Sequence, residues 1–185
     1  SFRELVLEAV KCGIRIFDVA PNYQNGAAEL WLASALGEAI GRSGTLSPQD
    51  FMIVTKTGQL SNRAWNDRKQ VSSEADWFDF NKDHIECQLR QSARIFEAFE
   101  NRYVLLHNPE LDSQLLDHDQ LMDRCFVLSE ACSKKLFCGW GISSWDGFYG
   151  TEKNLAPISL ENVNASFQGA QNRPTLLQAP MGLWN

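Results

Sequence analysis

The 185-residue chain lacks the features that mark several classes of protein. It has no apolar run near the ~18–20 residues of a membrane-spanning helix, and its five cysteines form no Cys-x-x-Cys pair. Scattered cysteines of odd number predict free thiols in a reducing compartment and argue against a disulfide framework or a zinc cluster. We therefore expect a cytoplasmic protein that holds no metal and does not enter a membrane.

Positive charge is also scarce. The chain has 17 Lys and Arg residues against 23 Asp and Glu residues, a formal net charge of −6. A field of that sign repels phosphate backbones, so nucleic acid is not an expected partner. A phosphorylated cofactor is still allowed, because a few local cations can hold one phosphate. The length and the 44% hydrophobic content suit one globular domain over residues 1–185.

Short apolar runs alternate with amphipathic stretches along the whole chain. Five runs have the length and residue types of buried parallel strands, namely residues 14–17, 51–54, 103–106, 137–142 and 175–177. Helical spacing of apolar residues is found in residues 2–12, 27–40, 82–99 and 121–133, and a short helix is expected from Ser159. Alternating strands and helices predict an α/β fold with a parallel sheet.

A polar residue follows each apolar run. These residues are Asp18 with Tyr23 shortly after it, Lys56, His107, Ser143 with Ser144, and Gln178. Each has an ordinary structural explanation alone, such as a cap for Asp18 or a solvated charge for Lys56. However, the carboxyl ends of parallel strands share one face, which carries the active site in such folds. The joint pattern therefore predicts one site at that face.

Together these segments resemble the aldo-keto reductase family. The resemblance rests on five stretches in order: Gly13 to Tyr23 with Asn25, Gly26 and Glu29; Ile53 to Lys56; Leu105 to Glu110; Gly139 to Trp145; and Leu177 to Pro180. It covers nearly the whole chain. It implies a parallel (β/α)8 TIM barrel and an oxidoreductase that transfers hydride from NADP(H) to an aldehyde or ketone.

The resemblance also implies residue roles. Tyr23 would donate the proton, Lys56 would favour loss of that proton, Asp18 would pair with Lys56, and His107 would orient the carbonyl oxygen. A free tyrosine has a pKa near ~10, and a neighbouring ammonium favours its phenolate form. Ser143, Ser144 and Gln178, with Asp18, would bind the cofactor.

The chain departs from the family pattern in three respects. Ser144 stands where the family usually has Asn, and Gly182 stands where a larger polar residue is common. Matched to the family, the chain also has only about five βα units, so we expect an incomplete barrel without the first strand and the last two units. The absent units would hold the cofactor phosphates, so we expect this chain alone to bind NADPH poorly.

Two other hypotheses remain open at this stage. One is a non-catalytic regulatory subunit that keeps the barrel and the cofactor site. The other is a truncated or split product with only a folding or oligomerisation role. The long polar loop over residues 57–81, which contains Trp65 and Trp77, is typical of a lid or a binding loop. No feature of the sequence identifies the substrate or the oligomeric state.

Overall fold

The computed structural model describes residues 1–61, 77–112, 117–148, 158–169 and 172–179. It contains one sheet of five parallel strands in the order β1-β2-β3-β4-β5, which is also their order along the chain. The strands are β1 (Ile16–Asp18), β2 (Met52–Thr57), β3 (Arg102–His107), β4 (Gly139–Ser143) and β5 (Leu176–Gln178). The α/β prediction with a parallel sheet is confirmed.

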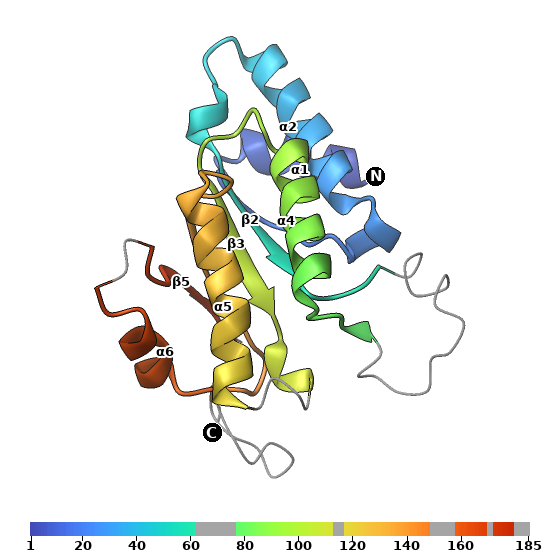
Figure 1. Ribbon diagram of the computed structural model, residues 1–185. Coiled ribbons are helices and arrows are strands. Elements are labelled where there is room, and N and C mark those ends of the chain that lie inside the picture. The colour runs from blue at the N-terminus through green and yellow to red at the C-terminus, as the bar shows by residue number, and fades with distance from the viewer. Residues whose placement is uncertain (62–76, 113–116, 149–157, 170–171, 180–185) are drawn as a thin grey trace, which may run out of the picture.

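The helices lie against the sheet in a single series (Figure 1). Helix α1 packs on α2, α2 on α4 and α4 on α5. The helices are α1 (Phe2–Lys11), α2 (Ala28–Ser43), α4 (Lys82–Ile95), α5 (His118–Ser133) and α6 (Leu160–Ser166), with short 3-10 turns η1 (Tyr23–Gly26), η2 (Pro48–Asp50) and η4 (Pro109–Leu111). A continuous row of contacting helices beside a parallel sheet is the arrangement of part of a (β/α) barrel.

Local sequence sets where the helices begin and end. The Ser1 hydroxyl accepts a hydrogen bond from the Glu4 amide at 3.3 Å, and a capping box starts α1. The Asp117 side chain accepts a hydrogen bond from the Gln120 amide and caps α5, which begins at His118, three residues earlier than the apolar spacing alone predicts. Helix α2 ends at Gly44, which has a left-handed φ of 66° that glycine adopts without strain.

Two apolar clusters fill the space between sheet and helices. One is made by α1, α2 and the first strands, with Leu36 and Ile53 at its centre. The second lies among α4, α5, α6, β3 and β4 and contains Trp140 and Phe167, whose ring centroids are 4.8 Å apart. Cys125 and Cys132 are buried in this second cluster, as their helical spacing predicts.

The strands run further than the apolar runs that predict them. Asp18, Lys56, His107, Ser143 and Gln178 are the last or nearly the last residues of their strands rather than the first residues of loops. In register, Asp18 lies beside Val54, His107 beside Ser143, and Ser143 beside Gln178. The backbone hydrogen bonds of the sheet therefore fix the starting point of each of these side chains.

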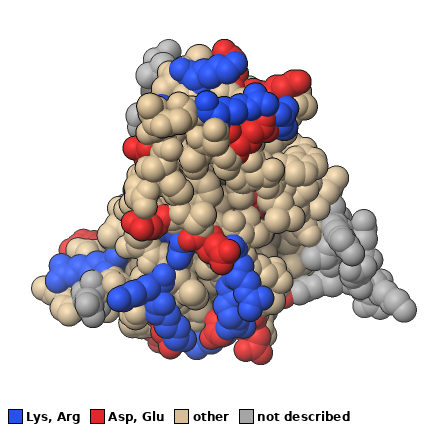
Figure 2. All heavy atoms as spheres, turned by 90° about the horizontal axis from the view of Figure 1, so that it is seen from above, with Lys and Arg blue, Asp and Glu red and all other residues tan. Residues whose placement is uncertain are grey.

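The opposite end of the sheet, where the strands begin, is shown in Figure 2, in which Lys and Arg side chains interleave with Asp and Glu side chains. None of the described helices is long and apolar enough to cross a membrane.

Candidate active site

An ion pair between a buried lysine and a partly exposed aspartate joins the first two strands. The Lys56 Nζ lies 2.7 Å from both carboxylate oxygens of Asp18 and 3.3 Å from the carbonyl oxygen of Val19. The Lys56 side chain is 1% exposed, whereas that of Asp18 is 40% exposed. An ammonium buried to this degree is tolerated only when a charge and hydrogen bonds compensate for its lost water. Asp18 therefore holds the Lys56 side chain in place.

Helix α2 and β2 are also linked by a buried polar contact. The Thr55 hydroxyl donates to the Glu29 carboxylate at 2.6 Å. Burial raises the pKa of Glu29, while hydrogen bonds from Thr55 and Ser92 oppose that rise. This contact holds the residue next to Lys56 against α2 and limits movement of the strand end.

Tyr23 reaches the ion pair from the turn after β1. Gln24 and Asn25 have left-handed φ values of 52° and 57°, which turn the chain sharply within η1. The Tyr23 ring lies over Lys56, with Nζ 4.9 Å from the ring centroid, within the ~6 Å range of cation–π contacts. The ring is 37% exposed, so the phenol can be approached from outside.

His107 completes the group from β3. Its ring centroid is 6.0 Å from that of Tyr23, with the planes at 78°. Burial, followed by the charge of Lys56, lowers the pKa of His107 to about 3. The imidazole is therefore neutral near neutral pH and can both donate and accept one hydrogen bond. Its Nδ1 is buried and has no hydrogen-bond partner among the described residues.

These side chains face a cavity of about 460 Å³ at the carboxyl ends of the strands. The residues lining it come from the loop after β1 and from the ends of β2 to β5 with the loops that follow them: Asn22, Tyr23, Lys56, Gln59, His107, Ser143, Ser144, Trp145, Gln178 and Ala179. Asp18 is not among the described residues that line the cavity, and its ion pair with Lys56 links it to the cavity. The structure thus gathers Tyr23, Lys56 and His107 at one cavity, with Asp18 behind them.

Ser143 and Gln178 form a hydrogen-bonded pair on the far wall. The Ser143 hydroxyl donates to the Gln178 amide oxygen at 2.9 Å, and the Ser144 amide donates to the Gln178 carbonyl oxygen at 2.9 Å. Among the described residues, no side chain or backbone group accepts a hydrogen bond from the Gln178 side-chain amide, so its N–H groups can bind another acceptor. The Ser144 hydroxyl instead accepts a hydrogen bond from the Gly147 amide at 2.7 Å and belongs to the following turn.

Comparison with known proteins identifies the family to which this chain belongs. The model of the Aldo/keto reductase family matches residues 1–154. The chain belongs to the aldo/keto reductase family.

Solved structures of aldo/keto reductases share its fold. A Bacillus halodurans aldo-keto reductase in its holo form is 22% identical, with a TM-score of 0.55, over 77% of this chain and 40% of its own. Glycerol dehydrogenase from Gluconobacter oxydans is 19% identical, with a TM-score of 0.62, over 100% and 46%. A Bombyx mori aldo-keto reductase in complex with NADP is 18% identical, with a TM-score of 0.62, over 98% and 49%.

This aldo/keto reductase chain therefore spans less than half the length of each of these three structures. The expected incomplete (β/α)8 barrel is confirmed by the five parallel strands and by these likenesses of fold. A search of curated protein sequences gives no match to the chain.

Four residues that line the aldo/keto reductase cavity were not expected from the sequence: Asn22, Gln59, Trp145 and Ala179. Each of them is next to, or three residues from, a site residue that the sequence predicts. Gln59 is held by a buried amide on α4, since Gln88 donates to its carbonyl oxygen at 3.1 Å and accepts from the Thr57 hydroxyl and the Gly58 amide. Trp65 and Gly182 lie outside the described residues, and Trp77 packs against the core.

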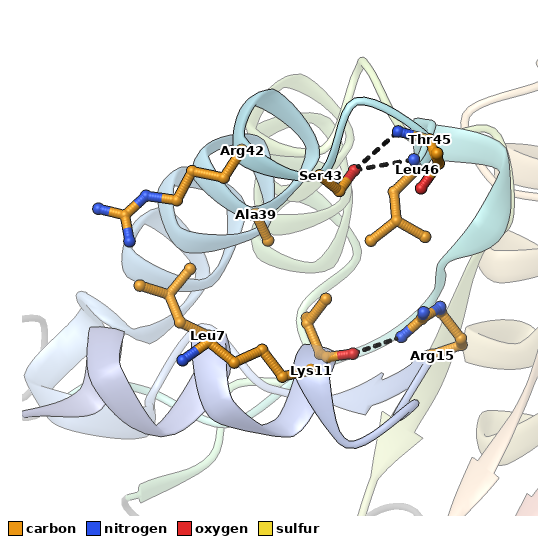
Figure 3. Close-up of a pocket in the computed structure, with 9 residues that line it drawn as sticks. Leu7, Lys11, Arg15, Ala39, Arg42, Ser43, Thr45 and Leu46 are labelled. Carbon is orange, nitrogen blue, oxygen red and sulfur yellow. Dashed lines mark hydrogen bonds between the residues drawn. The ribbon is translucent and has the colours of Figure 1, made fainter.

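A second cavity, of about 370 Å³, lies between the last turns of α1 and α2, and none of its lining residues lines the cavity of Tyr23 and His107 (Figure 3). Three cations line it, namely Lys11, Arg15 and Arg42. Lys11 and Arg42 sit in the last turns of their helices, where positive charge offsets the helix dipole. Arg15 donates to the carbonyl oxygens of Val10 and Ile14 at 2.8 and 2.9 Å. Helix termination accounts for these cations.

Proposed function

We propose that the protein containing this chain reduces an aldehyde or ketone with NADPH, and that Tyr23 supplies the proton. The single observation that carries the proposal is the convergence of a phenol, a buried ammonium and a neutral imidazole on one cavity. Membership of the aldo/keto reductase family and the NADP complex of the Bombyx mori protein support this reading.

The cavity wall suits one end of such a cofactor. A nicotinamide carboxamide needs both an acceptor and donors, and the Gln178 amide N–H groups with the Ser143 hydroxyl offer complementary groups. Among the described lining residues Lys56 is the only cation, and Asp18 already pairs with it. The described wall therefore fits the nicotinamide end of NADP(H) and gives no site for its phosphates. The bound nicotinamide would supply the hydride.

The protein's own groups act on the carbonyl oxygen. Tyr23 donates its phenolic proton to the oxygen as negative charge develops there. The Lys56 ammonium, facing the ring, stabilises the phenolate that remains, and Asp18 keeps that ammonium oriented. His107, neutral in the fold, donates a hydrogen bond to the same oxygen and fixes the carbonyl in place. The substrate leaves as an alcohol and the phenol regains its proton from solvent.

The test is Tyr23→Phe in the full-length protein, with NADPH oxidation followed over a panel of aldehydes and ketones. Loss of a general acid should lower kcat by about 10²–10⁴-fold. Tyr103→Phe is the matched control, because Tyr103 lies near the opposite end of β3 from His107 and should leave kcat unchanged. Undiminished turnover in Tyr23→Phe would remove Tyr23 from the mechanism. Cofactor that stays bound and unoxidised with every carbonyl would instead favour the non-catalytic regulatory subunit.

A further inference from the structure

The turn after β4 is fastened to the loop after β3 by one carboxylate. Glu110 lies in η4, three residues beyond His107, and its Oε1 accepts hydrogen bonds from the backbone amides of Trp145 at 2.7 Å and Asp146 at 3.4 Å. A carboxylate that accepts from two consecutive backbone amides is a strong anchor, because hydrogen bonds to charged groups are about twice as strong as neutral ones. The position of Trp145 is therefore set from the His107 side of the site.

The same turn is closed from its other end. The Ser144 hydroxyl accepts from the Gly147 amide at 2.7 Å, and the Ile158 amide donates to the Gly147 carbonyl oxygen. A side chain at Gly147 would meet Ser144 Oγ at 2.7 Å and the Ile158 side chain at 2.9 Å, so the turn is closely packed there. The backbone that carries Trp145 is thus held at both ends.

This rigid turn presents a large aromatic ring to solvent. Trp145 is 61% exposed, although Trp140, five residues earlier, is completely buried in the core. Trp145 also lines the cavity that Tyr23 and His107 line. An exposed tryptophan on a fixed backbone at the edge of a polar cavity is suited to contact a ligand, because the ring supplies a broad apolar face with little loss of conformational entropy.

We propose that Trp145 determines substrate specificity by stacking on a planar, apolar group attached to the substrate carbonyl, such as an aromatic ring. Glu110 is the positioning residue that aims Trp145. This inference rests on the proposed function of the cavity and adds the substrate class. The far wall of Ser143 and Gln178 suits the cofactor carboxamide, whereas Glu110 draws the Trp145 turn toward His107, which orients the carbonyl oxygen.

The experiment compares benzaldehyde with propanal in the full-length protein and in Trp145→Ala, Trp145→Phe, Glu110→Ala and Glu110→Gln. We expect Trp145→Ala to lower the ratio of kcat/KM for benzaldehyde to that for propanal by roughly tenfold, mainly through KM for benzaldehyde. Trp145→Phe should retain most of the preference. Glu110→Ala should lower the ratio as well, and Glu110→Gln should restore it because its amide oxygen still accepts from the turn. Trp31→Ala, a 47% exposed tryptophan on α2, is the control with no change expected.

The outcomes separate this inference from the proposed function. An unchanged ratio in an active Trp145→Ala enzyme overturns the role of Trp145, and a rise in KM for NADPH alone assigns the ring to the cofactor instead. A loss of ratio in Glu110→Gln as large as in Glu110→Ala overturns the positioning role. If the parent oxidises no NADPH, benzaldehyde binding measured by titration calorimetry decides: binding weakened by Trp145→Ala supports the aromatic contact without hydride transfer, and no binding by the parent overturns it.

Discussion

Replacing Asp18 by Asn would leave the buried Lys56 ammonium with no counter-charge in contact among the described residues. Lys56 is 1% exposed and its Nζ lies 2.7 Å from both Asp18 oxygens. Two unit charges at that distance attract by about 6 kcal/mol at an effective dielectric constant near 20. Solvent screens part of this attraction because Asp18 is 40% exposed. We therefore expect Asp18→Asn to lower the free energy of unfolding by about 3 kcal/mol, at the low end for a broken buried pair.

Urea denaturation followed by circular dichroism measures this loss. Glu8→Gln is the matched control, because it breaks the Lys11–Glu8 pair, whose side chains are 71% and 64% exposed. That exposed pair should contribute less than about 1 kcal/mol. The double variant Asp18→Asn with Lys56→Met removes the stranded charge and should recover most of the lost stability. A single variant no less stable than the control, or a double variant no better than Asp18→Asn, would refute the reasoning.

Two further predictions concern pH and packing. The folded-state pKa of His107 is lowered to about 3 from 6.5, so between these pH values the unfolded chain binds a proton that the native state does not. The free energy of unfolding should therefore fall as the pH drops from about 6.5 toward 3, by up to about 1.4 kcal/mol per pH unit. His107→Gln should show a shallower fall, and equal slopes would contradict the assignment. Gly141→Ala would place a Cβ against the backbone carbonyl of Leu176 and should cost about 3 kcal/mol or more, whereas Gly37→Ala in open space on α2 should add about 0.5–1 kcal/mol in the same melts.

The residues at the strand ends could be predicted from the sequence because two general rules of parallel sheets mark their positions. An apolar run marks a buried strand, and parallel strands deliver their ends to one face, so the convergence of Tyr23, Lys56 and His107 was predictable. The exact ends of the strands could not be predicted, because hydropathy falls at Lys56 and His107 while the hydrogen bonds of the sheet continue through them.

Contacts between distant turns could not be predicted from the sequence. Nothing around Glu110 indicates that it accepts hydrogen bonds from a turn 35 residues later, because the choice depends on how the loops after β3 and β4 meet. The sequence places Ser144 at the cofactor site but does not indicate that its hydroxyl accepts a hydrogen bond from the Gly147 amide, because the local turn sets that contact. The neutral state of His107 depends on its burial in the fold and on the charge of Lys56, which no short sequence motif indicates.

The five strands lie in the sheet in the same order as along the chain, and this has a consequence for synthesis on the ribosome. Each strand pairs with the one made just before it, so the sheet can grow by one βα step at a time as the chain emerges. Asp18 and Lys56 can meet once β2 is out, and His107 joins them with β3. The wall formed by Ser143 and Gln178 closes only when β5 is added, so nascent chains would hold the charged pair long before they have a complete cavity.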